Sequence, residues 1–141
     1  MGYTHYWYHL PQHTPAHDKQ WNSMLRLAND LFNNHPLAGA DGTGGAEATP
    51  ERIVFNGVGD DNSHETFWFR RDPEQALAEW RKERTEDDRY FSFCKTARKP
   101  YDICVVAMLA RAERLGLIRF ESDGSPAELK DGRKLEQQLG Q

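Results

Sequence analysis

The sequence predicts an α+β fold: a mixed sheet of about five strands with two main helices on one of its faces. Two observations lead to this prediction. Residues 21–32 and 101–115 repeat apolar side chains at intervals of three and four, the pattern of one buried helix face. Short aromatic and β-branched runs surround them, bounded by Gly, Pro, Asn and Asp as strands are. The order strand, helix, two strands, short helix, strand, helix, strand makes the split β-α-β unit of ferredoxin-like folds the nearest simple architecture.

The first half of the chain begins with an aromatic strand. Residues 2–10 are rich in Tyr and Trp and stop at a proline. Thr14-Pro15 then supplies the N-cap and first residue of a helix, which is expected to end within 33–36. Residues 37–50 hold four glycines among small residues but lack the spacing of a nucleotide-binding loop, so we expect a flexible linking loop there.

The second half alternates strands and helices. The strands are expected at 52–56, 66–70, 90–94 and 117–120. A short helix should open at Asp72-Pro73-Glu74-Gln75, where the glutamine can complete a capping box. A second long helix should start near Pro100. The polar tail 126–141 is expected to be peripheral.

Length and composition limit the classes of protein to consider. With 141 residues, 38% of them hydrophobic and 28% charged, the chain suits a single domain, 1–141, with one core and a well-solvated surface. Its net charge of −4 is unfavourable for non-specific binding to duplex nucleic acid. Two cysteines are too few for a disulfide framework, and the sequence contains neither a signal peptide nor a transmembrane run. These features predict a cytoplasmic protein that does not bind membranes.

A basic turn precedes the second long helix and carries most of the functional prediction. In the segment Phe93–Asp102, three cations and a threonine lie just before a helix N-terminus, where unpaired N–H groups and the helix dipole favour an anion. A strand-helix-strand crossover makes its two strands parallel, so the exit of the last strand should lie at the same edge. The residues expected to bind the ligand are Lys95, Thr96, Arg98, Lys99, Tyr101, Asp102, Ser122 and Asp123. The alternative is that Asp102 and Asp123 neutralise the cations in a structural charge network.

Catalytic and metal-binding patterns are incomplete. Cys94 adjoins the cations and a helix start, which makes it a candidate nucleophile, but no histidine lies near it in the sequence. Cys104 belongs to the apolar helix face and is expected to be core. Histidines recur every four residues between His5 and His17, but a strand and two prolines intervene, so they cannot share a helical face. No metal site or cofactor is therefore expected, and a non-enzymatic role is favoured over catalysis.

The N-terminal strand should sort its side chains by alternation. One face is expected to carry Tyr3, His5, Trp7 and His9, and the other Thr4, Tyr6, Tyr8 and Leu10. One of these faces can pack against the helix of Trp21. The other then leaves aromatic rings exposed, which suits a protein interface or a base-stacking surface, and we favour the interface.

Five segments of the chain are distinctive: Met1–Trp7, Ile53–Gly57, Glu65–Phe67, Phe93–Asp102 and Ser122–Gly124. Together they resemble one family of small uncharacterised proteins from bacteriophages, prophages and bacteria, and Phe93–Asp102 is the most specific of them. No activity is established for this family. The resemblance therefore implies a phage-type accessory protein in the cytoplasm of a bacterial host, without a mechanism.

Three functions are consistent with these patterns. The first is a binding protein for an anion, either a nucleotide, a phosphate-bearing signal or a nucleic-acid end, at the turn 95–102. The second is a protein-interaction or host counter-defence protein that binds a bacterial protein through exposed aromatics. The third is a small enzyme that acts on a phosphorylated substrate through Cys94 or an Asp–Lys pair. Convergence of Lys95, Arg98 and Asp123 favours the first, and a flat aromatic surface favours the second.

Overall fold

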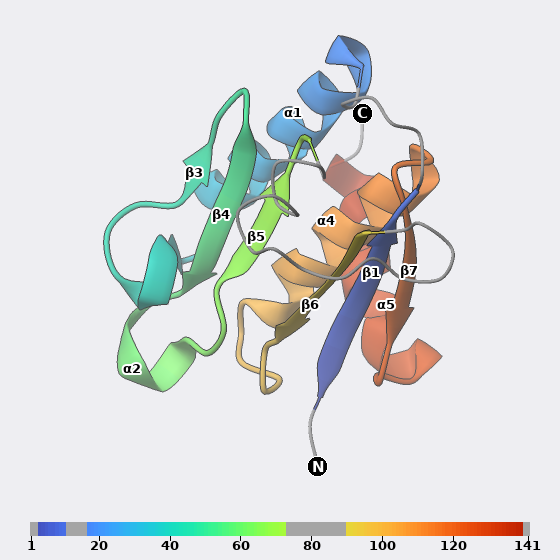
Figure 1. Ribbon diagram of the computed structural model, residues 1–141. Coiled ribbons are helices and arrows are strands. Elements are labelled where there is room, and N and C mark those ends of the chain that lie inside the picture. The colour runs from blue at the N-terminus through green and yellow to red at the C-terminus, as the bar shows by residue number, and fades with distance from the viewer. Residues whose placement is uncertain (1–2, 11–16, 73–89, 140–141) are drawn as a thin grey trace.

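The computed structural model describes residues 3–10, 17–72 and 90–139 and confirms the α+β class (Figure 1). Its strands are β1 (Thr4–His9), β2 (Leu37–Ala38), β3 (Glu47–Ala48), β4 (Arg52–Gly57), β5 (Phe67–Arg70), β6 (Tyr90–Lys95) and β7 (Ile118–Ser122). Its helices are α1 (Asp18–Asn34), the short α2 (Gly59–Asn62), α4 (Asp102–Arg114) and α5 (Pro126–Leu139). The short helix expected from Asp72 onward falls mostly outside the described residues, as does the expected cap Thr14-Pro15. The described part of α1 begins at Asp18, behind the N-cap His17.

The sheet that positions the site is a split β-α-β unit. Its strand order is β6-β1-β7, and β1 pairs antiparallel with both neighbours. β6 and β7 are therefore parallel to each other, as expected, and α4 connects them across β1. The C-terminal ends of β6 and β7 consequently lie at the same edge, next to the beginning of β1 and of α4 (Figure 1).

The expectation of one mixed sheet is wrong in detail, because the strands divide into two sheets and every described pairing is antiparallel. In the second sheet, β2 and β3 flank β4, and β5 also pairs with β4. The segment 37–50, expected as a flexible loop, supplies both β2 and β3. Its glycines allow this: a Cβ on Gly39 would lie 2.6 Å from the carbonyl oxygen of Gly45, so the backbone folds closely on itself.

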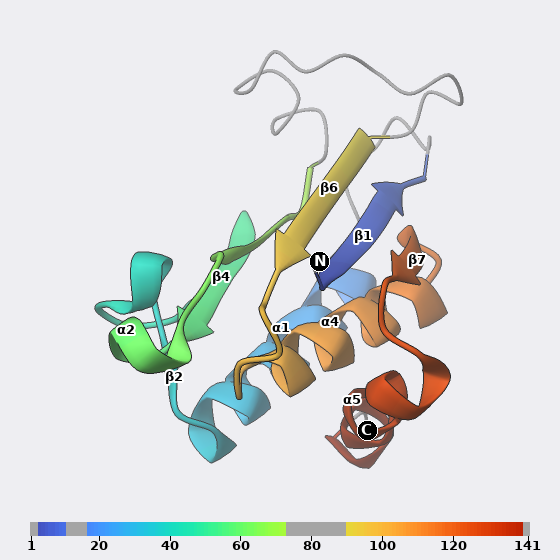
Figure 2. The same ribbon diagram turned by 90° about the horizontal axis from the view of Figure 1, so that it is seen from below.

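Two helices cover one face of both sheets. Figure 2 shows α1 and α4 side by side beneath the strands, with α5 next to α4. Aromatic rings join the sheets to each other and to the helices. The ring centres of Trp7 in β1 and Phe67 in β5 lie 5.5 Å apart, and those of Trp21 in α1 and Phe69 in β5 lie 6.2 Å apart. Within the described part of the chain, every helix is too short or too polar to span a lipid bilayer.

The tail expected to be peripheral forms α5, which packs closely on α4. A Cβ on Gly132 would lie 2.5 Å from the Cβ of Val106, so only glycine lets the two helices approach this far. Arg111 of α4 and Glu136 of α5 are both buried, and Arg111 Nε donates to Glu136 Oε2 at 2.6 Å. The few apolar residues of the tail did not predict this packing, because it depends in part on Gly132 and on the ion pair between Arg111 and Glu136.

Candidate functional site

Segments far apart in the sequence meet at the sheet edge where β6 and β7 end. Thr4 and Asp123 exchange bonds there: the Thr4 N–H donates to Asp123 Oδ2 at 3.1 Å, and the Asp123 N–H donates to the Thr4 carbonyl at 2.9 Å. The Lys95 N–H donates to Glu65 Oε1 at 2.8 Å and so ties β6 to the segment before β5. These contacts join four of the five distinctive segments of the sequence, and a Cβ on Gly57 of the fifth would lie only 3.2 Å from the Tyr101 ring.

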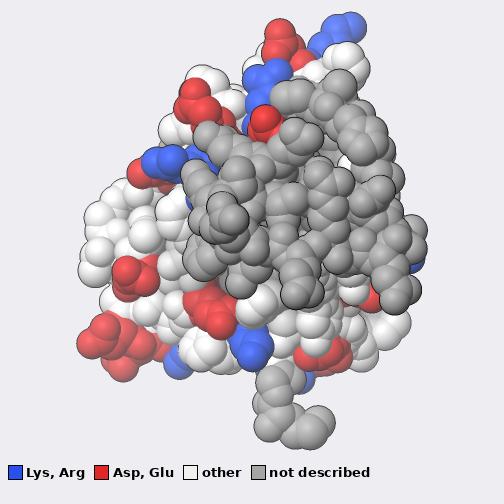
Figure 3. All heavy atoms as spheres, viewed as in Figure 1, with Lys and Arg blue, Asp and Glu red and all other residues white. Residues whose placement is uncertain are grey.

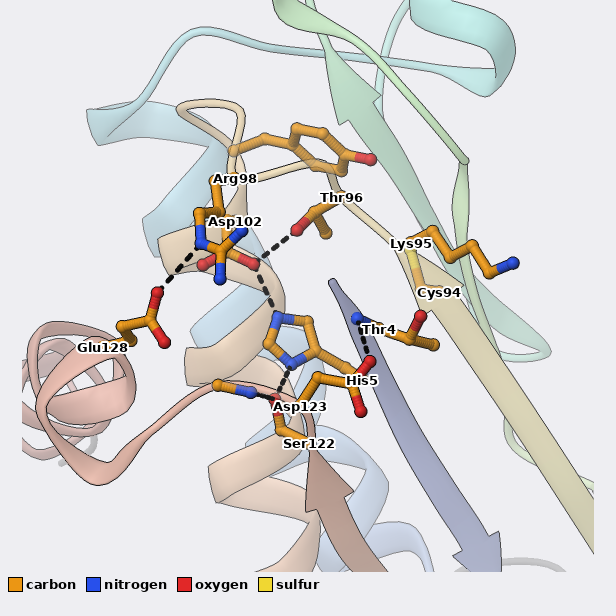
Figure 4. A network of polar contacts seen from close by, with 12 residues as sticks. Thr4, His5, Cys94, Lys95, Thr96, Arg98, Asp102, Ser122, Asp123 and Glu128 are labelled. Atoms are coloured by element: carbon orange, nitrogen blue, oxygen red, sulfur yellow. Dashed lines mark hydrogen bonds and ion pairs between the residues drawn. The ribbon is translucent and has the colours of Figure 1, made fainter. Parts of the chain in front are cut away.

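The centre of this edge is a chain of hydrogen bonds through His5 (Figure 4). Its Nδ1 lies 2.8 Å from Ser122 Oγ, and its Nε2 lies 2.6 Å from Asp102 Oδ1. The Thr96 hydroxyl donates to the same carboxylate oxygen at 2.6 Å. The imidazole is fully buried, at 0% exposure. Three of the predicted residues therefore do come together, around a histidine that was not among the predicted ligand residues.

Strand register and helix geometry create this chain of bonds. His5 and Ser122 are direct partners in the β1–β7 pairing, so their side chains lie on the same face of the sheet. Tyr3, His5, Trp7 and His9 share that face, as alternation predicted, and the structure shows that it is the inner one, because all four are buried. Asp102 is in the first turn of α4, where a carboxylate is favoured by the helix dipole.

The basic turn before α4 places Arg98 at the edge of this network. Ala97 and Arg98 have φ values of 52° and 55°, and the Lys99 N–H donates to the Thr96 carbonyl at 3.0 Å, which closes a tight left-handed turn. The Arg98 guanidinium lies 4.0 Å from the centre of the Tyr3 ring, and its Nε donates to Glu128 Oε2 at 2.9 Å. Neither Tyr3 nor Glu128 was predicted as a site residue.

Lys95 does not join Arg98. Its ammonium group lies 5.8 Å from the centre of the Phe93 ring, and Figure 4 shows the two cationic side chains pointing in different directions. Asp123 is occupied at the β1–β7 edge, where it also accepts from the Tyr6 hydroxyl at 3.2 Å. The convergence of Lys95, Arg98 and Asp123 that would favour a broad anion pocket is therefore not found. Arg98 lies beside the His5 network, with its guanidinium over the Tyr3 ring.

The two tyrosines near the network differ from what the sequence predicts. Tyr101, an expected ligand residue, is buried, and its hydroxyl donates to the carbonyl of Glu65. Burial, with a smaller contribution from nearby negative groups, raises its pKa well above the ordinary value. Tyr3, which was not predicted as a site residue, is the tyrosine that contacts Arg98. Burial, followed by the charge of Asp102, raises the pKa of Tyr3 to about 12. Both phenols therefore stay protonated at physiological pH.

Cys94 is not the accessible thiol that its cationic neighbours in the sequence suggest. Its side chain is fully buried, and its Sγ contacts the carbonyl oxygen of Glu65 at 3.5 Å. Burial raises its pKa far above the ordinary value, and the charge of Glu65 raises it further. Lys95 and Arg98 are exposed, whereas the Cys94 side chain is buried. These features argue against a nucleophilic Cys94.

We expect both cysteines to be free and unreactive in the folded protein. Cys104 is also buried, and burial raises its pKa to about 12. A colorimetric thiol reagent should therefore detect no rapid reaction in native buffer and two thiols in guanidinium chloride without reductant. Rapid reaction of one thiol in the folded protein, or fewer than two after denaturation, would contradict this assignment.

Within the described ranges, no group of three His, Cys, Asp or Glu side chains has the arrangement of a metal site. Comparisons with protein-family models, curated proteins and solved structures found no match to this chain.

Proposed function

We propose that this protein binds a small anionic ligand at Arg98, on the edge formed by β1, β6, β7 and the start of α4. The ligand class is a nucleotide, another phosphate-bearing small molecule or the phosphorylated end of a nucleic acid. One observation carries the proposal: Arg98 is held in place from two sides, yet neither Nη1 nor Nη2 meets a hydrogen-bond acceptor among the described residues. Arginine binds phosphate and carboxylate with just this pair of terminal nitrogens.

The contacts of Arg98 prepare the guanidinium for a ligand without blocking it. Stacking on Tyr3 restricts the side chain and so lowers the entropy lost when an anion binds. The Glu128 carboxylate occupies Nε only, and this ion pair is exposed to solvent, where such pairs contribute little to stability. The Arg98 side chain is 59% exposed, so an anion in solution can reach it.

The backbone conformation at this point also supports a ligand site. Two consecutive residues other than glycine, Ala97 and Arg98, adopt left-handed φ values, each at a cost of roughly 1–3 kcal/mol. A turn of this shape is what brings the Arg98 side chain over Tyr3. Strain of this kind is concentrated at binding and active sites, where the position of a side chain matters more than local stability.

The surrounding charges favour a small ligand over a long nucleic acid. Asp102, Asp123 and Glu128 lie at the same edge as Arg98 and would repel an extended polyanion. Figure 3 shows positive and negative side chains interspersed over the described part of one face, without a gathered basic surface. With a net charge of −4, these features suit a ligand that presents one phosphate or carboxylate to one arginine.

Replacing Arg98 with Ala should weaken binding of such a ligand by about tenfold or more. A charge-assisted hydrogen bond contributes roughly 1.5–3 kcal/mol, and ~1.4 kcal/mol is a factor of ten in affinity. Thermal-shift screening of the wild type with inorganic phosphate, nucleotides, cyclic dinucleotides and 5′-phosphorylated oligonucleotides identifies the probe. Titration calorimetry with that probe then compares Arg98→Ala with Arg26→Ala, a matched change at an exposed position of α1.

The Arg26→Ala control should bind as the wild type does, and both variants should keep the wild-type melting temperature without ligand. If none of the probes shifts the wild type, or if Arg98→Ala unfolds the protein, the cluster is structural.

A second candidate function follows from an exposed aromatic surface. Phe91 and Phe93 of β6 are 43% and 49% exposed, and the Phe91 ring lies 5.2 Å from Tyr8 and 6.0 Å from Tyr6. A contiguous aromatic group on the solvent side of a sheet is typical of protein interfaces. It supports binding to a bacterial protein, in keeping with the phage-type accessory role that the resemblance implies. If no anion shifts the melting temperature of the wild type, protein binding through this aromatic surface becomes the favoured function.

A further inference from the structure

We propose that Ser122 is a nucleophile for acyl transfer, activated by His5 and oriented by Asp102, and that the protein hydrolyses a small carboxylic ester. This activity goes beyond ligand binding at Arg98 and does not depend on it. The structural requirement for such a site is a hydroxyl within hydrogen-bond reach of a base, and a third group that orients the base. This site meets the requirement: Ser122 Oγ lies 2.8 Å from His5 Nδ1, and Asp102 Oδ1 lies 2.6 Å from His5 Nε2.

The chemistry of the three side chains determines which atom donates in each of these two hydrogen bonds. A carboxylate can only accept, so His5 Nε2 carries a proton and donates it to Asp102 Oδ1. In the neutral imidazole, Nδ1 is then the acceptor, and the Ser122 hydroxyl must donate to it. This is the polarity that a serine nucleophile and its general base require. The Thr96 hydroxyl donates to the same carboxylate oxygen and helps to hold the Asp102 side chain in place.

The environment of Ser122 suits its role as the member that meets substrate. It is the last residue of β7, it is partly exposed, and the turn Asp123-Gly124 follows it. The Gly124 N–H donates to Ser122 Oγ at 2.9 Å and so stabilises negative charge that develops on that oxygen. A Cβ at Gly124 would lie 2.8 Å from the Tyr3 hydroxyl, so this close backbone approach needs glycine.

The base is shielded from water by aromatic rings. The centre of the Tyr3 ring lies 5.1 Å from the centre of the His5 ring, and that of the Phe120 ring lies 5.9 Å from it. The imidazole therefore exchanges protons through Ser122 Oγ and through groups bound beside it, rather than with bulk solvent. Shielding of this kind strengthens the electrostatic interaction between His5 and Asp102.

The reaction balances with water as the only co-reactant. Ser122 Oγ attacks the ester carbonyl carbon, its proton passes to His5 Nδ1, and the C–O bond to the leaving alcohol breaks as Nδ1 returns that proton to the alcohol oxygen. Water then attacks the acyl group on Ser122, giving a proton to Nδ1. The acid departs, and the proton returns to Ser122 Oγ. Asp102 stays ionised throughout as a positioning residue that stabilises the imidazolium.

The decisive experiment is covalent labelling of the full-length folded protein with a fluorescent fluorophosphonate, followed by peptide mass spectrometry. The phosphonyl group should be found on Ser122, and Ser122→Ala should abolish labelling. Ser125→Ala is the matched control, because it removes a neighbouring hydroxyl in the same turn that has no contact with His5; it should label as the wild type does. No adduct on folded wild-type protein, or an adduct that persists in Ser122→Ala, overturns the proposal.

Hydrolysis of p-nitrophenyl acetate tests the positioning role of Asp102. Asp102→Asn should lower kcat by roughly a hundredfold or more, the contribution of a general base, while KM changes less than about twofold. A merely structural role would instead lower the fraction of folded protein, which circular dichroism measures directly. Unchanged kcat in folded Asp102→Asn overturns the assignment of Asp102, and unchanged kcat in Ser122→Ala overturns the whole site.

Discussion

Replacing Glu136 with Ala should lower the free energy of unfolding by roughly 3–5 kcal/mol, because it leaves a buried arginine without its counter-charge. Glu136 Oε2 accepts from Arg111 Nε at 2.6 Å and from Arg114 Nη2 at 2.7 Å. Burial by itself raises the pKa of Glu136, but the bonds to Arg111 and Arg114 outweigh it, so the pKa lies below the ordinary value and the carboxylate stays charged. Urea unfolding of the wild type and the variant measures the difference.

The matched control for this prediction is Glu121→Ala. Glu121 also pairs with an arginine, Arg119, at 3.6 Å, but both side chains are about half exposed, so its removal should cost less than about 1 kcal/mol. The double variant Arg111→Met/Glu136→Leu should recover most of the loss, since it removes both buried charges. A loss below about 1 kcal/mol for Glu136→Ala would show that this ion pair does not hold α5 against α4.

Acidification from pH 6.5 to pH 4 should lower the free energy of unfolding by about 3 kcal/mol through His9 alone. Burial lowers the pKa of His9 from 6.5 to about 4 in the folded protein. In the unfolded chain, His9 therefore binds a proton below about pH 6.5, whereas in the folded protein it binds one only near pH 4. The free energy of unfolding consequently falls as the pH falls through this window. One pKa unit corresponds to about 1.4 kcal/mol, which sets the size of the effect.

The variant His9→Gln tests this pH dependence, because it keeps a polar side chain of similar size and cannot titrate. Its stability, measured by urea unfolding at several pH values, should change less than that of the wild type between pH 6.5 and pH 4. His35→Gln is the matched control at a partly exposed position where a histidine faces solvent, and it should keep the wild-type slope. Equal slopes for wild type and His9→Gln would contradict the assignment to His9.

Much of the local structure is predictable from short-range rules. The apolar spacing of 21–32 and 101–115 predicted α1 and α4, and α4 begins at Asp102, two residues after the Pro100 that marked its expected start. Alternation in β1 predicted which side chains share a face, although it left open which face points inward. The crossover rule predicted that β6 and β7 run parallel and end at one edge. Each of these rules depends on residues that are close in the sequence or on the handedness of the backbone.

The features that sequence reasoning missed depend on pairing between distant segments. No local signal shows that β1 inserts between β6 and β7, or that the glycines of 37–50 let two short strands flank β4. α5 was missed as a core element because its tightest contacts are a glycine and an ion pair, which hydrophobic patterning does not register.

The sequence by itself determined the ingredients of the candidate site: a basic turn, a helix start with Asp102, and a Ser-Asp-Gly turn at the end of the last strand. Only the tertiary structure decided their roles. The register of β1 on β7 sets His5 opposite Ser122, and the crossover sets Asp102 beneath it, so two predicted ligand residues became partners of a buried histidine. After the left-handed turn, the Arg98 side chain lies against Tyr3 and Glu128, whereas the Lys95 side chain lies near the Phe93 ring. The direction of a long charged side chain depends on partners contributed by other elements, and sequence neighbours do not specify those partners.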